Sequence, residues 1–553
     1  MKKIRLKYKN GYIENIEEDT TLYEIANEIK SEFKYQIVGA KLGEYLVDLD
    51  TKVTNNEEVE FYDISSKIGH DIYSRSLEFL LMVAFKKIIP KDADILLHYS
   101  LENGIYCEIE GKKVTSITIK KIEEEMKNMI KQKIKFNHMI VDRLDAIKYF
   151  KKQGQLDKVD SLKYITNKTI TLYSINDVYD YFYGPLVYDT SFLNKFEIIY
   201  LKENSFILAF PKREKPNKLL KYREHKLTQK TYKDFQKWGK QIGITSAPEL
   251  NELIAKGQDG DVVRLFETHY EEEISRVTDE IYKNKDKIKV ILLAGPSSSG
   301  KTTTAKKLAL YLRVKGITTK TISLDNYFID RIYAPKDEFG NYDFSDIKAL
   351  DVKLFQRQLL RMLKGSKVLM PTYDFITGKK VYEDNYIKLE ENEIVIIEGI
   401  HTLNEKLTDV VPRENKFKIF MSPLVNLKLD NHNRVHTTDV RRIRRIVRDN
   451  LFRGTNAETT LAMWPNVDKE ANINIYPYQD DADAMINSSL GYELNVLRIY
   501  AEPLLFGIDS KSKEYAEAQR LINLLKNFLT ITSEVVPKDS ILREFIGGSV
   551  FKD

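Results

Sequence analysis

The stretch KVILLAGPSSSGKTTTAKKLALYLRVK, residues 289–315, decides the fold of the second half of this chain. Its first six residues have the apolar, branched composition of a buried strand. The next eight, GPSSSGKT (295–302), have the spacing G-x-x-x-x-G-K-[S/T] of a phosphate-binding loop. The following segment has helical spacing and ends at Gly316. A strand, a glycine-bounded loop and a helix in this order predict an α/β domain that holds a phosphate at a helix N-terminus.

The residue types in this loop suit a nucleotide triphosphate. Its glycines let backbone N–H groups turn toward the phosphates, Lys301 reaches the β and γ phosphates, and the Thr302 hydroxyl holds Mg²⁺. The expected nucleotide-binding residues are Gly295, Ser297, Ser298, Ser299, Gly300, Lys301, Thr302 and Thr303.

The loop alone does not identify the reaction. The guanine-reading motif N-K-x-D is absent after the loop, and so is the L-S-G-G-Q motif of ABC ATPases. A small-molecule kinase that uses ATP and Mg²⁺ remains. Such an enzyme needs a base for the acceptor hydroxyl, an acidic magnesium anchor and cationic side chains near the transferred phosphoryl group.

Two acids are expected beside the loop. Asp325 ends the strand-like segment GITTKTISLD, and Glu398 ends the buried strand NEIVIIE. Because ligands of open parallel sheets bind at the carboxyl ends of the strands, both acids should lie near the phosphates. Asp325 is the expected base, and Asp325, Glu398 and Thr302 are the expected Mg²⁺ residues.

The cationic side chains come from the helical segment TTDVRRIRRIVRDNLFRG, residues 437–454. It follows Glu398 by about forty residues, where a closing lid is expected, and Gly454 is a good helix stop. The alternative is a solvated or RNA-binding basic face. The expected catalytic residues are Asp325, Lys301, Arg445, Arg448 and Arg453.

Composition limits the remaining function classes. With 553 residues the chain exceeds one ordinary core, and it has no apolar run of 18 residues, so no membrane partner is expected. The N-terminus has no apolar h-region and therefore does not indicate a signal peptide. One cysteine, Cys107, excludes an internal disulfide framework and indicates a reducing, cytoplasmic setting. The net charge of +5 is small for a polyanion-binding protein.

Five parts are expected along the chain. Residues 1–63 alternate as strands around one helix and fit a β-grasp; residues 64–220 mix helix and strand. Residues 221–285 form a helical connector in which Tyr270, Ile274 and Val277 make a packing stripe. Residues 286–509 form the phosphate-binding α/β domain, and 510–553 a packing helix and tail to which no phosphate role is assigned.

The region from about 288 to 507 resembles the uridine kinase/phosphoribulokinase family. Seven motifs match in order: GPSSSGKTT, LDNYF, YDFSDIKALD, PTYDF, VIIEGI, RRIVRDNLFRG and YQDDADAMINSSL. The resemblance implies that Asp325 is the base for a sugar 5′-hydroxyl, that Thr302 and Glu398 help to hold Mg²⁺, and that the arginines contact phosphates. The acceptor-binding residues that it implies are Tyr327, Asp343, Tyr373 and Phe375.

The first two parts resemble the TGS domain and the second domain of threonyl-tRNA synthetases. The joint architecture is similar to a bacterial group of nucleoside kinase-like proteins. At the positions of the synthetase's four ligand-type side chains this chain has Arg75, Phe79, Phe182 and Leu186. None of these binds zinc, so the resemblance implies a retained fold without that hydrolytic site.

Departures from the kinase motifs leave the acceptor open. Uridine kinases carry a pyrimidine-reading histidine where this chain has Gly378, an acid where it has Ser345, and an arginine where it has Thr455. A nucleoside-like small molecule is the first candidate acceptor, and a sugar phosphate is an alternative. An RNA- or ribosome-associated regulator that binds RNA through its N-terminal parts is a third hypothesis, and homo-oligomerisation is open.

The pair His432 and His436 has the H-x-x-x-H spacing of a zinc site. It lacks the glutamate of H-E-x-x-H and shows no third ligand, so no metal is expected there.

Overall fold

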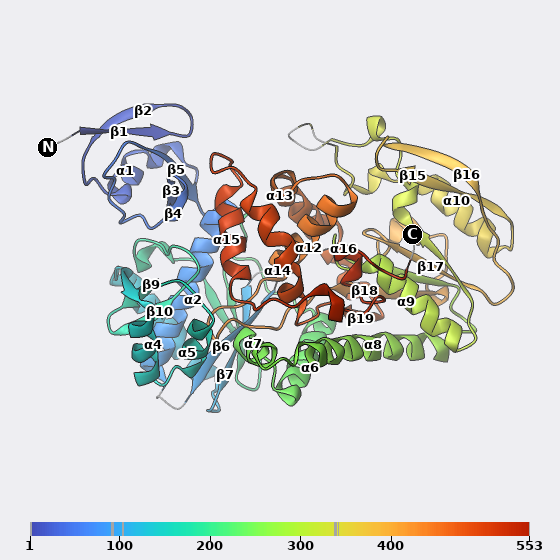
Figure 1. Cartoon of the computed structure of the whole chain (residues 1–553), viewed down its shortest axis with the longest axis horizontal. Helices are drawn as coiled ribbons and strands as arrows, with labels where there is room; N and C mark the ends of the chain where they lie inside the picture. The colour runs from blue at the N-terminus through green and yellow to red at the C-terminus, as the bar shows by residue number, and fades with distance from the viewer. Residues whose placement is uncertain (1–2, 90–92, 102–103, 337–339, 341, 552–553) are drawn as a thin grey trace.

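The computed structural model describes residues 3–89, 93–101, 104–336, 340 and 342–551 (Figure 1). The sequence also predicts that a helix ends at Pro90 and that a hairpin turns at residues 102–104; Pro90, Glu102 and Asn103 lie outside these ranges. Within these ranges, no helix combines the length and apolar composition that crossing a bilayer requires.

The N-terminal part is a mixed sheet that covers one helix. Its strand order is β2-β1-β5-β3-β4, with β1 parallel to β5 and antiparallel to β2. Side chains along β1 alternate between exposed and buried because one face covers α1 (Leu22–Glu28), which begins with a capping box from Thr21 and Glu24. The arrangement is a β-grasp. Its strands are β1 (Lys3–Tyr8), β2 (Ile13–Glu17), β3 (Ile37–Leu42), β4 (Tyr45–Val47) and β5 (Glu57–Asp63).

The second part packs helices against two antiparallel sheets. Helix α2 (Lys67–Ile88) is buried along most of its length, and it shares one continuous apolar core with the β-grasp. The sheets have the orders β11-β12-β7-β6 and β10-β9-β8. The remaining elements are β6 (Asp94–Leu101), β7 (Gly104–Glu110), α3 (Ser116–Lys131), β8 (Asn137–Asp142), α4 (Arg143–Lys152), α5 (Leu156–Lys163), β9 (Thr169–Ile175), β10 (Val178–Tyr181), β11 (Glu197–Tyr200) and β12 (Ser205–Ala209).

The connector is helical, as the sequence indicates. It consists of α6 (Lys226–Ile242), α7 (Ala247–Ala255) and the long α8 (Asp259–Lys283), which runs along the lower edge of the molecule in Figure 1. The predicted stripe of Tyr270, Ile274 and Val277 is buried in the core that it shares with the phosphate-binding α/β domain, which confirms its packing role.

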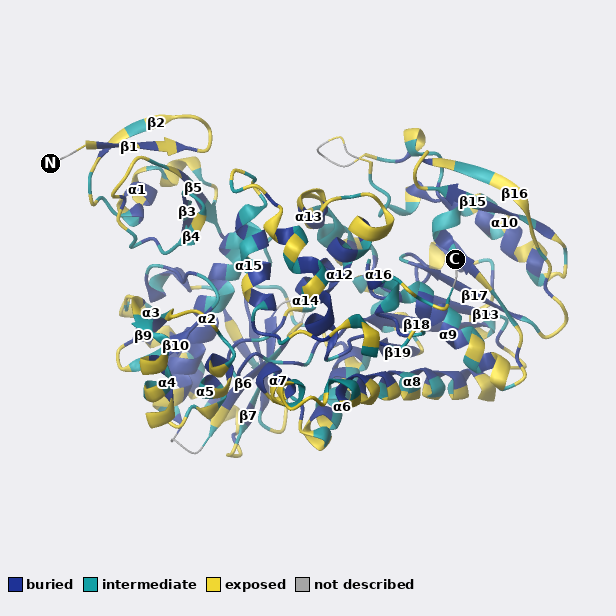
Figure 2. Ribbon diagram, viewed as in Figure 1, coloured by how far each residue is buried: buried dark blue, intermediate teal, exposed yellow. Residues whose placement is uncertain are grey.

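A five-stranded, fully parallel sheet forms the centre of the last large part. Its order is β14-β17-β13-β18-β19. Strands β13, β17 and β18 are buried throughout because helices cover both faces (Figure 2). The fold class expected from the sequence is therefore confirmed. The strands are β13 (Val290–Ala294), β14 (Thr319–Ser323), β17 (Ile394–Gly399), β18 (Lys416–Ser422) and β19 (Ala484–Asn487).

Helices and one hairpin complete this part. The hairpin of β15 (Val368–Asp374) and β16 (Lys379–Ile387) lies beside α10 (Val352–Leu363), away from the N-terminal parts (Figure 1). The other helices are α9 (Lys301–Val314), α11 (Glu405–Thr408), α12 (Thr437–Phe452), α13 (Ala457–Asn474) and α14 (Glu493–Phe506).

The C-terminal region returns to the middle of the molecule. Helix α15 (Tyr515–Leu525) is the predicted packing helix, with Ala518, Leu521, Ile522 and Leu525 buried. The short α16 (Arg543–Ile546) contacts α12.

Candidate active site

The phosphate-binding loop joins the C-terminal end of β13 to α9. A Cβ atom at Gly295 would lie 2.3 Å from the carbonyl oxygen of Met421 on β18, so only glycine permits this approach. Gly300, with a φ of +90°, turns the chain into α9 at Lys301. The eight expected nucleotide-binding residues lie in this loop and in the first turn of α9. The N–H groups of such a first turn have no helical acceptor and suit an anion.

The expected catalytic lysine lies between the loop and the acids. Lys301 Nζ donates to the Pro296 carbonyl oxygen at 3.2 Å. Burial lowers the pKa of Lys301, while the negative charges of Glu398 and Asp325 oppose this effect. The ammonium is therefore close enough to both acids to interact with them electrostatically.

The two expected acids do converge on the loop. Glu398 on β17 lies level with Leu293 of β13 and with Ser323 of β14, and Asp325 follows β14 directly. Thr302 Oγ1 donates to Glu398 Oε1 at 3.4 Å. The shared edge of parallel strands thus brings together three residues that are 23 or more positions apart in the sequence.

This group has the chemistry of a magnesium site. Burial raises the pKa of Glu398 to about 7, the charge of Asp325 adds to this, and Lys301 opposes it. Two mutually repelling carboxylates and a hydroxyl are hard oxygen ligands, and a divalent cation would relieve the repulsion. Thr302, Glu398 and Asp325 therefore fit Mg²⁺.

Arginines of helix α12 donate hydrogen bonds to the phosphate-binding loop. Arg441 Nε donates to the Ser297 carbonyl oxygen at 3.1 Å, and Arg444 Nη1 to the Ser298 carbonyl oxygen at 3.3 Å. Arg445 Nη1 donates to Ser297 Oγ at 3.1 Å. The sequence indicated Arg445, whereas the direct loop contacts of Arg441 and Arg444 were missed because spacing does not show which helix face meets the loop.

The basic helix is not a uniformly solvated face. Arg441, Arg442 and Arg444 are buried. Arg445 and Arg448 both donate to Asp449, at 3.0 and 2.7 Å. Burial lowers the pKa of Arg445 to about 10, while Asp449 opposes this effect. Arg453 follows the last residue of α12, and 41% of its side chain is exposed. Its guanidinium carbon lies 5.4 Å from the centre of the Phe375 ring.

Aromatic rings form the expected acceptor side of the site. The ring centres of Tyr373 and Phe375 lie 5.1 Å apart, in a cluster with the rings of Phe328 and Phe344. The Phe375 side chain is half exposed. Asp343 accepts a hydrogen bond from the Ser345 backbone at 2.9 Å in the loop before α10.

Tyr327, which was expected on the acceptor side, lies in the core. Its side chain is fully buried, and its hydroxyl donates to Gln358 Oε1 at 2.8 Å on α10. The 3₁₀ turn that follows β14 directs the ring into the core, where it packs edge-on to Phe355. Asp325 of the same LDNYF motif instead interacts electrostatically with Lys301 and Glu398.

The space beside Gly378 is filled by another side chain. A Cβ atom at Gly378 would lie 2.7 to 2.9 Å from Arg331 Nε, Cβ and Cζ. Arg331 also donates to the Phe375 carbonyl oxygen. Where the kinase motif has a histidine, this chain therefore places a guanidinium beside Phe375, which no single motif in the sequence indicated.

At the four positions of the synthetase's ligand-type side chains, the second part has an apolar contact and one arginine. Phe79 and Leu186 are fully buried, and the rings of Phe79 and Phe182 lie 5.3 Å apart. Arg75 Nη1 donates to the Pro185 carbonyl oxygen at 2.8 Å. No metal-binding side chain stands at these four positions.

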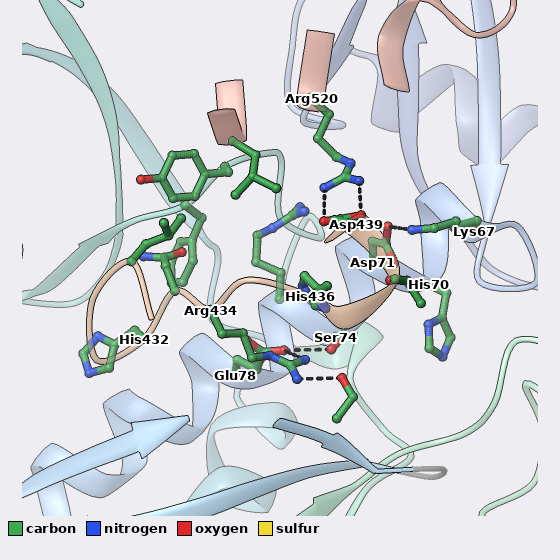
Figure 3. A pocket seen from close by; sticks show the side chains of 18 of the residues that line it. Lys67, His70, Asp71, Ser74, Glu78, His432, Arg434, His436, Asp439 and Arg520 are labelled. Carbon is green, nitrogen blue, oxygen red and sulfur yellow. Dashed lines mark hydrogen bonds and ion pairs between the residues drawn. The ribbon is translucent and has the colours of Figure 1, made fainter. Parts of the chain in front are cut away.

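A polar cavity of about 190 Å³ lies nearby, between α2, the loop before α12, and α15 (Figure 3). Arg520 bonds both carboxylate oxygens of Asp439, at 2.6 and 2.8 Å. His432 and His436 lie apart in this view, and His432 Nδ1 bonds Asp180 Oδ2 at 2.5 Å. The H-x-x-x-H spacing therefore does not bring two metal ligands together.

The C-terminal tail reaches the phosphate-binding loop. Glu544 Oε2 accepts a hydrogen bond from the Thr303 backbone N–H at 3.1 Å. The sequence contained no signal for this contact, since the tail has no strand–loop–helix context of its own.

Comparison with known proteins gives two separate matches. Residues 290–490 match the model of the phosphoribulokinase / uridine kinase family. A threonine–tRNA ligase of Carboxydothermus hydrogenoformans is 24% identical over 261 residues, which are 44% of this chain and 40% of the ligase. The ligase of Fusobacterium nucleatum is 30% identical over 182 residues, 32% of this chain and 29% of its own. The chain thus spans about two fifths or less of these curated relatives.

Solved structures have only low similarity to this chain. A possible uridine kinase from Bacillus stearothermophilus is 24% identical, covers 26% of this chain and 80% of its own, and has a TM-score of 0.20. D-glycerate 3-kinase from Cryptococcus neoformans is 13% identical, and the match covers 37% of this chain and 89% of the kinase, with a TM-score of 0.28. With the parallel sheet, the loop and the family match together, residues 290–490 form a kinase domain of the phosphoribulokinase / uridine kinase family, joined to an N-terminal region homologous to threonine–tRNA ligases.

Proposed function

We propose that this protein transfers the γ-phosphate of ATP to a hydroxyl group of a nucleoside or a related small metabolite. The observation that carries the proposal is the convergence of Asp325 and Glu398 on the phosphate-binding loop, with Glu398 3.4 Å from the Thr302 hydroxyl. A loop used only to bind a nucleotide needs no base at the acceptor side.

Each charged residue has a role in this proposal. Asp325 accepts the proton of the acceptor hydroxyl, and Lys301 neutralises charge on the transferred phosphoryl group. Arg445, Arg448 and Arg453 supply further positive charge. Thr302, Glu398 and Asp325 hold Mg²⁺, which when bound shields the β and γ phosphates.

The acceptor lies on the side of Tyr373 and Phe375. Phe375 offers a flat, half-exposed ring to a base or sugar, and Asp343 lies in the adjoining loop. Two guanidinium groups, Arg331 and Arg453, flank Phe375. These cations also suit an acceptor that already carries a phosphate or carboxylate, such as the alternative acceptor, a sugar phosphate.

Replacing Asp325 by asparagine tests the proposal. The variant should still bind Mg·ATP but should lose transfer, by at least about 10²-fold, because general-base catalysis contributes about 10²–10⁴. The assay is ADP release with a panel of nucleosides and sugar phosphates. Asp286→Asn, at an exposed acid before β13, is the matched control. Wild-type turnover by Asp325→Asn would refute the assignment of the base.

A second function is favoured by the homology of the N-terminal region to threonine–tRNA ligases. In this hypothesis the protein is an RNA-associated regulator in which nucleotide occupancy acts as a switch. Binding of labelled tRNA to filters, measured at several salt concentrations, separates the hypotheses. Submicromolar binding that weakens with salt, together with no transfer to any acceptor, would favour the regulator.

The division into parts at residues 63, 220, 285 and 509 is also a proposal. These positions fall between elements: β5 ends at Asp63, α8 at Lys283 and α14 at Phe506. Action in the cytoplasm is proposed from the single cysteine, Cys107, which is buried on β7.

A further inference from the structure

We infer that the C-terminal segment, residues 539–547, is an autoinhibitory element in which the Glu544 carboxylate occupies the place of a nucleotide phosphate oxygen. The inference rests on the proposed nucleotide site and concerns its regulation. The contact is direct: the Thr303 N–H, one of the free amides of the first turn of α9, donates to Glu544 Oε2 at 3.1 Å. Amides of this turn are those that the loop offers to the α and β phosphates.

A carboxylate and a phosphate cannot share this amide. Each is an anion that needs the same N–H, and two anions at one helix N-terminus repel each other. Glu544 also acts on the rest of the site, because it belongs with Glu398 and Asp325 to the acids that interact with Lys301. Nucleotide binding therefore requires that Glu544 leaves, and the tail competes with ATP within the same chain.

The tail is held in place by packing on both sides of the loop. Ile541 is fully buried and lies against Gly300, where a Cβ atom would be 3.0 Å from Ile541 Cδ1. Phe545 is fully buried, and its ring lies 5.0 Å from the Arg444 guanidinium, which itself bonds the loop at Ser298. The segment thus contacts both Gly300 of the loop and Arg444 of α12.

Polar contacts hold the start of the segment on α9 and join the segment to the residues just before it. Asp539 accepts from Lys307 Nζ at 2.8 Å, on the same helix as Thr303. Arg543 donates to the carbonyl oxygens of Ser533 and Val536 at 2.6 and 2.7 Å. Because the contact between Asp539 and Lys307 does not involve the phosphate amides, Asp539 can stay docked while Glu544 moves away, whereas the Arg543 contacts break when residues 541–547 are released.

The test compares nucleotide binding by the full-length protein and by Glu544→Ala and Glu544→Gln, measured by calorimetry with the non-hydrolysable analogue Mg·AMP-PNP. Losing a hydrogen bond to a charged group should tighten binding by Glu544→Ala about 10- to 100-fold. Glu544→Gln, which keeps the acceptor but not the charge, should fall between Glu544→Ala and the wild type. Glu534→Gln is the matched control, since Glu534 is exposed in the same tail; its affinity should equal that of the wild type.

Hydrogen exchange provides a second readout. Addition of Mg·AMP-PNP to the wild type should increase exchange in residues 541–547, because the segment is released, and should protect residues 295–304. Unchanged affinity in Glu544→Ala, with unchanged tail exchange, would overturn the autoinhibition while leaving transfer from Asp325 as a separate question. No binding by any variant would instead refute the nucleotide site itself, and with it this inference.

Discussion

Replacing Lys158 by methionine removes the cation at the centre of a buried network between the synthetase-like region and the kinase domain. Lys158 Nζ lies 2.6 Å from Asp180 Oδ1 and 2.7 Å from Asp430 Oδ1, and all three side chains are at most 2% exposed. Burial alone would lower the pKa of Lys158, but Asp180 and Asp430 raise it above its usual value. The ammonium is therefore charged, and these two acids are its ion-pair partners.

The expected cost follows from the burial of the partners. Breaking a buried ion pair by removing one member costs about 3–5 kcal/mol, because the other charge remains buried without compensation. Asp430 also accepts from the backbone N–H groups of His432 and Asn433, both at 2.9 Å, so the loss should open the loop around residues 430–433. At 1.36 kcal/mol per factor of ten, the opening equilibrium should rise on the order of 10²–10⁴-fold.

Hydrogen exchange followed by mass spectrometry measures this opening. Peptides spanning residues 428–436 should exchange on the order of 10²–10⁴-fold faster in Lys158→Met. The control is Lys148→Met, whose ion pair with Asp145 is 78% and 67% exposed and whose loss should leave this loop unchanged. Adding Asp430→Asn to Lys158→Met should recover part of the protection, since one uncompensated charge is removed. Equal exchange in Lys158→Met, the control and the wild type would refute the reasoning.

Three further outcomes are expected. The pKa of Glu398 is raised to about 7, so protons should compete with Mg²⁺ for its carboxylate. The affinity for Mg²⁺, measured in the presence of ADP, should fall about tenfold per pH unit below pH 7. A flat affinity profile from pH 5.5 to 7 would contradict this. Burial lowers the pKa of His401 to about 4, so the folded state excludes a proton that the unfolded chain takes up below 6.5. Stability should therefore fall by about 3 kcal/mol as the pH drops from 6.5 to 4, and thermal unfolding of His401→Gln should show a shallower pH dependence. Gly378→Ala should lower the melting temperature more than Gly154→Ala: both glycines have positive φ, a cost of about 1–2 kcal/mol for alanine, but only Gly378 faces a side chain, that of Arg331.

Local sequence was sufficient for the centre of the fold. The loop between β13 and α9 could be predicted because its strand, glycines, lysine and helix are contiguous. The proximity of Asp325 and Glu398 could also be predicted, because parallel strands end at one edge of a sheet whichever strands are neighbours. The roles of these residues in catalysis stay predictions.

The positions of other site residues could not be predicted without the path of the folded backbone. The motif placed Tyr327 beside Asp325, but the 3₁₀ turn after β14 rotates it into the core. The arginines of α12 were evident as a group, yet the face that meets the loop depends on how α12 packs among its neighbours. Arg331 entered the space beside Gly378 because the turn after β14 and the β15–β16 hairpin meet there, which no spacing records.

The sequence by itself determined the β-grasp, the phosphate-binding loop and the parallel sheet, because these arise from short-range periodicity and from contiguous residues. Only the tertiary structure decided how the parts act on one another. The contact between Thr303 and Glu544 joins residues 241 positions apart, and that between Lys158 and Asp430 joins residues 272 apart. A single carboxylate in a tail carries no local pattern, and its role depends on which backbone amide the folded chain places within 3.1 Å of it.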